Sequence, residues 1–575
     1  MKIKFKIIVI LFLGAFLMSS CEDFFEIDDR EKLTEELVLS KDADVSAMWA
    51  YLYHNLEMGF TQVGNAMLAN ACDEADLNAP FAAIQKFNDG SWNSFDNPED
   101  SWNSLFAGIR NANKFLESTD PAVNKRFTYD EYRIVDPVRY ARLTRELKAY
   151  HIDAKFIKAY CYFELWKRYG AVPIVDQLIS LEESYELNRN SSTEVVNYIL
   201  GLLDEIIPEF AVLETMEGTE YNNGKWSSNH FGRITKGAAL ALKSRTLLYA
   251  ASPLNSSNEQ YDQALCIEAA KTAAEIINMG LYSTNLDYRS IFLDKTASNP
   301  ENILDNRVMV NNFNYMERWN YPLGGSDQWV TTGIGTNATC PSQGLVDAYE
   351  TIDGSPVDPQ DPYTNRDPRF KQTILSNGDM FNDAPVESFV GGKAGIGDKN
   401  ATTTGYYLKK FIREKLNLNI DATGPHVWYV FRYSEVLLNY AEAMYYAHGA
   451  STKMGYVNGG DLSAIDAINL IRGRTGVGMP ARTSLTEDQL RNERRIELAF
   501  EGHRFWDVRR WKIAEQTENM PLKGMRITKE GESLTYEVVE IEKRKFVSPA
   551  MYRYPIPFVE MTNYSDWTQN TGWDN

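Results

Sequence analysis

Apolar residues recur at helical spacing along much of this chain. Within residues 142–169, one side of the pattern consists of five apolar positions separated by 3 or 4 residues: Tyr150, Ala154, Ile157, Cys161 and Leu165. Such spacing returns each side chain to the same face of an α-helix. Gly170 is a suitable residue to end this helix, and Pro173 prevents its continuation. The pattern therefore predicts an amphipathic helix that ends at Tyr169.

The same periodicity predicts further helices over residues 197–210, 235–251, 261–279, 433–448 and 461–472. The second and third are joined by a short Ser-Pro-Leu-Asn turn and should form a helical hairpin. Small residues at the expected crossings suggest tetratricopeptide-like packing, although a 34-residue repeat is not regular enough to establish this from periodicity alone. We predict a mainly α fold, in which a scaffold of tetratricopeptide-like helical hairpins carries a loop-rich C-terminal region.

Residues 486–511 carry the most marked helical signals. Thr486 and Gln489 match a capping box, and Gly502 interrupts the helix that follows. Two pairs of opposite charge lie three residues apart and are expected to form modest ion pairs: Arg494 with Glu497, and Arg504 with Asp507. A role of His503 as a general base finds little support, because no nucleophile can be placed beside it.

Four stretches are rich in Gly, Pro, Asn and Asp and should not be helical: residues 88–100, 311–341, 353–368 and 391–404. Loops of this length in a compact protein are usually functional or disordered. The tail, residues 546–575, contains three prolines and is expected to run in an extended form over the surface.

The N-terminus carries a separate signal. Lys2, Lys4 and Lys6 precede 12 apolar residues, and two serines then lead directly into Cys21. Twelve residues cannot span a bilayer of about 30 Å, which needs roughly 20, so residues 1–20 are predicted to be a cleaved signal peptide. A cysteine at this place is typical of bacterial lipoproteins. We expect lipid on Cys21 and an acidic tether over residues 21–35; the alternative is a secreted protein without lipid.

The net charge argues against a nucleic-acid partner, and the cysteine content argues against a disulfide-stabilised fold. The formal charge of the 575 residues is −20, and loss of the three N-terminal lysines takes it to −23. Such a field repels phosphate backbones and anionic lipid, so nucleic acid is not an expected partner, and the lipid on Cys21 is the expected membrane attachment. Four later cysteines are too few for a disulfide scaffold. Cys161 and Cys266 lie in helical patterns and should be buried apolar side chains.

Several segments, in order along the chain, resemble one known family. They are residues 102–113, 154–173, 235–245, 366–370, 432–438, 493–511, 554–557 and 569–572. Through them the chain resembles the SusD/RagB family of outer-membrane lipoproteins. The resemblance implies an N-terminal SusD-like helical region over residues 36–310 and a C-terminal region over residues 311–575. It also implies cell-surface capture of a polysaccharide or its oligosaccharides, and delivery to a SusC-like TonB-dependent transporter in the outer membrane.

Two alternatives to glycan capture stay open. RagB-like members of the family are associated with peptide uptake, so a peptide ligand is one of them. A glycoside hydrolase is the other, but it needs two carboxylates about 5 to 10 Å apart, and nothing in the sequence singles out such a pair. The six histidines are scattered and form no HExxH motif, so neither a metal nor a cofactor is expected. We therefore expect a binding protein and not an enzyme.

Aromatic residues in the loops suggest where a sugar would bind. A flat ring matches the apolar face of a sugar, while neighbouring amide and carboxylate groups take its hydroxyls. We expect the loop around Trp92 and Asn93, joined by Asp73, to face the loop that follows residue 311. The candidate ligand-binding residues are Asp73, Trp92, Asn93, Trp319, Tyr321 and Trp329. The alternative is that these rings anchor their loops to the scaffold.

Overall fold

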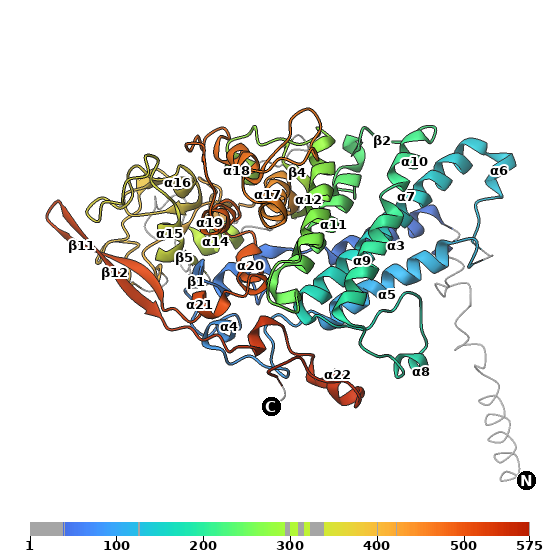
Figure 1. Ribbon diagram of the computed structural model, residues 1–575, viewed down its shortest axis with the longest axis horizontal. Helices are drawn as coiled ribbons and strands as arrows, with labels where there is room; N and C mark the ends of the chain where they lie inside the picture. Colours follow the sequence, from blue (N-terminus) through green and yellow to red (C-terminus); the bar gives the residue numbers. More distant parts are fainter. Residues whose placement is uncertain are drawn as a thin grey trace, which may run out of the picture.

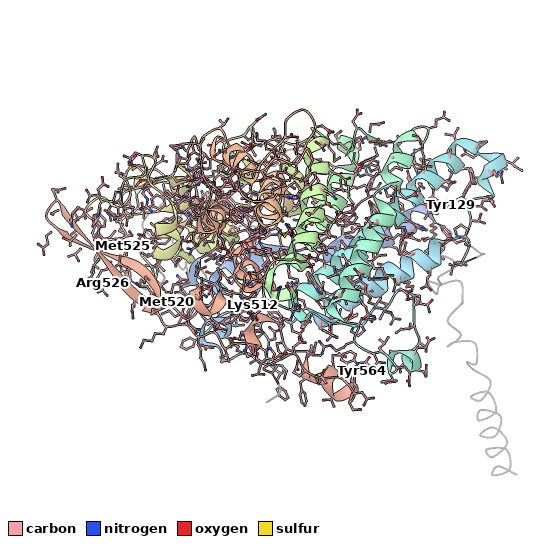
Figure 2. All side chains as sticks on the ribbon, viewed as in Figure 1. Tyr129, Lys512, Met520, Met525, Arg526 and Tyr564 are labelled. Atoms are coloured by element: carbon pink, nitrogen blue, oxygen red, sulfur yellow. The ribbon has the colours of Figure 1, made fainter. Side chains whose placement is uncertain are left out.

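The computed structural model describes residues 38–39, 41–124, 127–293, 299–308, 315–322, 338–398, 401–420 and 422–573. The signal peptide, Cys21, the acidic tether and Trp329 lie outside the described residues. The molecule is elongated, with long helices in one half and short helices, loops and strands in the other (Figure 1). Tyr129 lies toward one end of the long axis, and Met525 and Arg526 lie toward the other (Figure 2).

The long helices form a continuous stack, in which each packs against the next. In order they are α5 (Trp102–Thr119), α7 (Pro137–Tyr169), α9 (Ser192–Ile206), α11 (Lys236–Ala251), α12 (Gln263–Asn278), α17 (Tyr433–His448) and α18 (Ala464–Arg472). The mainly α, tetratricopeptide-like fold is therefore confirmed. Because α17 and α18 belong to the C-terminal region, both regions contribute to one stack, and their boundary at residue 310 stays a prediction.

The helix boundaries follow the local signals in the sequence. Asp136 accepts a hydrogen bond from the N–H of Arg139 at the start of α7, and Gly170, with φ of 74°, ends the helix. The side chain of Thr235 caps α11 in the same way. Thr486 and Gln489 form the predicted capping box at α19 (Glu487–Glu497). Each of these bonds satisfies backbone groups that have no partner within the helix.

The remaining helices are short and lie around the stack. They are α3 (Asp42–Leu52), α4 (Gln85–Asp89), α6 (Tyr132–Val135), α8 (Leu181–Ser184), α10 (Glu209–Thr215), α13 (Ser290–Leu293), α14 (Tyr315–Asn320), α15 (Gln343–Ala348), α16 (Arg369–Thr373), α20 (His503–Arg510), α21 (Ala514–Thr517) and α22 (Phe558–Asn563). The prediction of no helix over residues 311–341 is wrong for α14. Glu317 holds this helix, because its carboxylate bonds His426 at 3.0 Å and the N–H of Arg413 at 2.8 Å.

Among the described residues, the strands form six antiparallel pairs. They are β1 (Ala75–Leu77) with β5 (Thr339–Pro341), β2 (Tyr221–Asn222) with β3 (Lys225–Trp226), β4 (Asn302–Val308) with β10 (His426–Arg432), β6 (Ile374–Leu375) with β9 (Tyr407–Leu408), β7 (Met380–Phe381) with β8 (Ala384–Pro385), and β11 (Leu522–Glu530) with β12 (Ser533–Glu542). The last pair is a long hairpin at one end of the molecule (Figure 1), and the sequence pattern did not reveal it.

Arg494 and Arg504 are buried and pair with residues far from them in sequence, so the two ion pairs expected three residues apart are wrong. Arg494 bonds Asp507 at 2.8 Å, while Glu497 bonds Arg432 at 2.9 Å and Arg474 at 2.8 Å. Burial explains the difference, because a buried charge requires a partner that is itself fixed in the core.

The C-terminal tail runs over the helical stack, as predicted. Within its described residues, α22 is the one α-helix. The N–H of Tyr554 bonds the carbonyl of Arg168 at 2.8 Å, and Trp567 Nε1 bonds the carbonyl of Leu187 at 3.0 Å. The hydroxyl of Tyr564, labelled in Figure 2, donates to the carbonyl of Ser184 at the end of α8 at 2.9 Å. The tail thus ties α22 to α8 and the loop that follows it.

Cys72, Cys161, Cys266 and Cys340 are free and buried, which confirms the burial predicted for Cys161 and Cys266. Within the part of the chain that the structure describes, no helix has the length and apolar character needed to cross a membrane.

Candidate functional site

The pairing of β1 with β5 joins the two regions that carry the candidate binding residues. Asp76 faces Cys340, and Leu77 faces Thr339. Asn78 extends the contact, because its N–H bonds the carbonyl of Ala338 at 3.1 Å and its Oδ1 accepts the Ala338 N–H at 2.7 Å. We call residues 75–78 and 338–341 the β1–β5 junction. It places the loop after Asp73 beside the end of the 311–341 stretch.

Phe81 projects from the loop that leaves the junction and is 100% exposed. Hydrogen bonds fix the neighbouring chain on both sides of this loop: Thr403 Oγ1 donates to Asp76 at 2.7 Å, and Gln85 Nε2 donates to the carbonyl of Leu77 at 3.0 Å. A solvated aromatic ring close in sequence to fixed polar groups suits a sugar, which presents an apolar face and hydroxyls. The sequence analysis missed Phe81, although an aromatic residue directly after Pro80 in a turn was an available signal.

Trp92 is an anchor and not an exposed platform. Only 2% of the residue is exposed, and its ring packs against Phe87, Tyr554 and Trp573 at centroid distances of 5.0, 5.2 and 4.8 Å. The C-terminal tail covers it, so no face is left for a sugar. Asn93 is exposed, but its Oδ1 accepts the N–H of Phe95 at 2.9 Å and shapes the turn.

Asp73 binds to α19 and α20. Its carboxylate bonds Arg504 through two nitrogens at 2.7 and 2.8 Å, and Arg495 at 2.8 Å. Burial opposes ionisation of Asp73, but the two arginines outweigh it and hold the pKa of the carboxyl well below its usual value. The carboxylate is therefore engaged within the protein and joins the junction loop to the helices.

Two candidate binding residues of the 311–341 stretch are described: Trp319 lies on α14, and Tyr321 directly follows this helix. Tyr321 is 1% exposed; its hydroxyl donates to the carbonyl of Arg413, and its ring meets Phe381 edge-on at 5.3 Å. Trp319 is half-buried on α14. Asn320 ties this helix to the junction, because its Oδ1 accepts the N–H of Thr339 at 2.9 Å. Tyr321 is thus an anchor, and Trp319 retains exposed surface near the junction.

A second exposed aromatic pair lies on the tail side of the molecule. Phe95 and Phe558 stack with centroids 4.0 Å apart, and both are exposed. The N–H of Phe558 also bonds the carbonyl of Ser94 at 3.0 Å. These rings belong to the Trp92 loop and the C-terminal tail, which are separate segments from those that carry Phe81 and Trp319.

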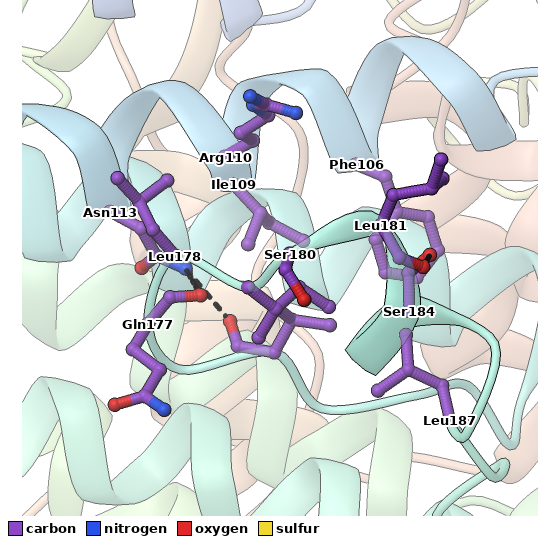
Figure 3. Close-up of a pocket in the computed structure, with 12 residues that line it drawn as sticks. Phe106, Ile109, Arg110, Asn113, Gln177, Leu178, Ser180, Leu181, Ser184 and Leu187 are labelled. Carbon is purple, nitrogen blue, oxygen red and sulfur yellow. Dashed lines mark hydrogen bonds between the residues drawn. The ribbon is translucent and has the colours of Figure 1, made fainter.

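A groove of about 490 Å³ runs between α5 and the chain that leads into α8 (Figure 3). Asn113 holds the far wall, because its Nδ2 donates to the carbonyls of Val175 at 3.0 Å and Gln177 at 3.2 Å. Figure 3 shows that the Arg110 guanidinium points away from the groove. Phe106 and six aliphatic side chains form the apolar part of the lining: Ile109, Val175, Leu178, Ile179, Leu181 and Leu187. Such walls suit an apolar group and not a hydroxyl-rich one.

Metal chemistry gains no support from the geometry. Among the described residues, no group of three or more His, Cys, Asp or Glu side chains could hold a metal ion. The fold and the junction instead define a class of binding protein, in which a helical stack supports a loop surface with exposed aromatic rings.

Comparison with known proteins finds similarity to one family. Residues 300–573 match the model of the SusD family. A stretch of 214 residues is 25% identical to the SusD-like protein P25 of Formosa agariphila, a match that spans 35% of this chain and 37% of the relative. Over this C-terminal stretch the chain is similar to the SusD family.

Solved structures show the same fold over the whole described chain. A SusD-like protein of Bacteroides fragilis superposes with a TM-score of 0.74 at 27% identity, covering 93% of this chain and 98% of that one. A SusD-like carbohydrate-binding protein of the same species gives 0.69 at 22% identity, with coverage of 92% and 99%. A laminarin-binding SusD-like protein gives 0.61 at 19% identity, again with 92% and 99%. Two of these descriptions name carbohydrate-binding or laminarin-binding proteins, which share this fold.

Proposed function

We propose that this protein captures a glycan at the cell surface through the β1–β5 junction, Phe81 and Trp319. The observation that carries the proposal is the fully exposed ring of Phe81, in the loop that leaves the hydrogen-bonded junction. A sugar ring would stack on Phe81, and its hydroxyls would bond polar groups of the junction. The carbohydrate-binding relatives support a ligand of this class.

Delivery to a transporter is the second part of the proposal. The lipid on Cys21 would hold the protein to the outer membrane, and the acidic tether would let it act as a lid over a SusC-like TonB-dependent barrel. Opening and closing would then be a rigid-body motion of the helical stack. Co-purification from mild detergent tests this part, because a large barrel protein should accompany the chain. Recovery of the chain alone, under conditions that preserve barrel complexes, would contradict it.

A glycan array followed by isothermal titration tests ligand capture. Phe81→Ala should weaken binding of the selected glycan about tenfold, the equivalent of about 1.4 kcal/mol. Phe558→Ala is the matched control, because it removes an exposed aromatic ring from the C-terminal tail. Equal affinity of the wild type and Phe81→Ala would remove the junction as the site.

The same measurements separate the alternatives. Binding of peptides without binding of any glycan would show the peptide-capturing function. Release of shortened sugars from a bound glycan would show a glycoside hydrolase. Saturable glycan binding without release of product is the result that we expect.

A further inference from the structure

A second cavity lies between the β2–β3 hairpin, the chain before α11 and the start of β4. Its volume is about 180 Å³, which limits an occupant to about one ring. The residues that matter here are Lys225, Trp226, Phe231, Tyr282, Asn302 and Asp305. None of them belongs to the β1–β5 junction, so this cavity is separate from the site proposed above.

Two buried oxygen atoms in this cavity wall have no hydrogen-bond partner among the described residues: Asp305 Oδ1 and Asn302 Oδ1. Asp305 is only 5% exposed. Its other oxygen accepts bonds from Asn302 Nδ2 at 2.9 Å and Arg307 Nε at 2.8 Å. Buried polar atoms are nearly always hydrogen-bonded, so a pair of unpartnered acceptors indicates a missing donor.

A glycine lies beside the buried Asp305 oxygen in the cavity wall. Gly232 lines the cavity, and a Cβ at that position would stand 3.9 Å from Asp305 Oδ1. The φ of Gly232 is +91°, which a residue with a side chain rarely adopts. Burial raises the pKa of Asp305, and Arg307 only partly opposes this, which agrees with a carboxyl group that lacks solvation.

Aromatic rings form the other walls, and cations hold two of them in place. The guanidinium of Arg233 lies 4.0 Å from the ring centre of Trp226, whose Nε1 also bonds the carbonyl of Ile234 at 2.7 Å. The guanidinium of Arg307 lies 4.1 Å from the ring centre of Phe231. The walls are therefore fixed before any ligand arrives.

We propose that this cavity binds a single neutral sugar residue, whose hydroxyls donate to Asp305 Oδ1 and Asn302 Oδ1. A ring with an apolar face and several hydroxyls matches both the aromatic walls and the two acceptors. A cationic ligand fits less well, because Arg233, Arg307 and Lys225 surround the same space. The proposal stands independently of whether the junction captures a glycan.

Titration of the full chain with glucose, galactose, mannose and xylose tests the proposal. At least one of them should bind saturably, and Phe231→Ala should weaken that binding about tenfold. Asp305→Asn should weaken it by a similar factor, because an amide N–H would then face the sugar in place of an acceptor. Asp507→Asn is the matched control, since it alters a buried aspartate paired with arginine outside the cavity and should leave binding unchanged.

Phe81→Ala separates this site from the junction, because it should leave monosaccharide binding intact. Absence of saturable binding for all four sugars would overturn the proposal and show a cavity filled by water only. Unchanged binding in Phe231→Ala would overturn it as well, even if Asp305→Asn fails to fold. Loss of monosaccharide binding in Phe81→Ala but not in Phe231→Ala would assign the sugar to the junction instead.

Discussion

Arg504 and Arg495 make the Asp73 carboxylate part of the scaffold. Asp73→Asn should lower the free energy of unfolding at pH 7 by about 3 kcal/mol, because it leaves two arginines without their partner. The pKa of Asp73 is lower in the folded state than in the unfolded chain, so this stability is present above about pH 4 and is lost as the pH falls further. Denaturant titrations of both proteins at several pH values should show the difference shrinking below pH 4. A constant difference would contradict the role of the ionised carboxylate.

Trp92 and Phe81 should respond to truncation in opposite ways. Trp92→Ala should cost about 3–5 kcal/mol of stability, because it empties a core position beneath the tail. Phe81→Ala should change stability by no more than about 0.5 kcal/mol, since the ring is solvated. Thermal melts of both variants check this. A large drop in the melting temperature of Phe81→Ala would show that its ring packs against the protein.

At the scale of secondary structure, the features that could be predicted are those that depend on residues close in sequence, such as the ends of helices. The end of α7 and the starts of α11 and α19 were predicted correctly, because nearby residues mark them. The start of α7, expected at residue 142, lies at Pro137. The β1–β5 pair could not be predicted, because each strand has three residues and their partners lie far apart in sequence. For the same reason, the sequence placed Trp92 in a binding loop but could not show that Trp573 covers it. The sequence thus named two loops that the β1–β5 pair brings together, but it did not single out Phe81. The ligand-binding role of these loops stays a prediction.

The capping box of α19 gives a prediction of its own. Thr486→Ala should lower the free energy of unfolding by about 1 kcal/mol, because the N–H of Gln489 loses its acceptor. Thr486→Ser keeps the hydroxyl and is the control that should retain most of the stability. Denaturant midpoints of the three proteins make the comparison. Equal loss in both variants would assign the effect to the threonine methyl group instead.

At the scale of the whole molecule, the sequence predicts that the protein is attached to a membrane through Cys21, a residue outside the described part of the chain. Cys21→Ala should remove the site of acylation and release the protein from the membrane fraction, with its fold unchanged. Cell fractionation of the variant checks its release from the membrane, and circular dichroism checks its fold. External protease should also remove the wild-type protein from intact cells; digestion only after lysis would place it facing the periplasm.

The contact of α17 with α12 has a consequence for how the protein is made. The ring of Tyr261 stacks on Tyr446 at 3.5 Å, and Gln263 Nε2 bonds the carbonyl of Ala447 at 2.7 Å, so the outer face of α12 is completed by residues far along the chain. During synthesis and export, the first half of the protein therefore presents an apolar face with no partner until α17 has been delivered. A fragment ending at residue 310 should aggregate at concentrations where the full chain stays monomeric. The helices of the first half can therefore complete their packing only after the second half is present. A chain that stops midway is expected to be bound by chaperones or degraded by proteases.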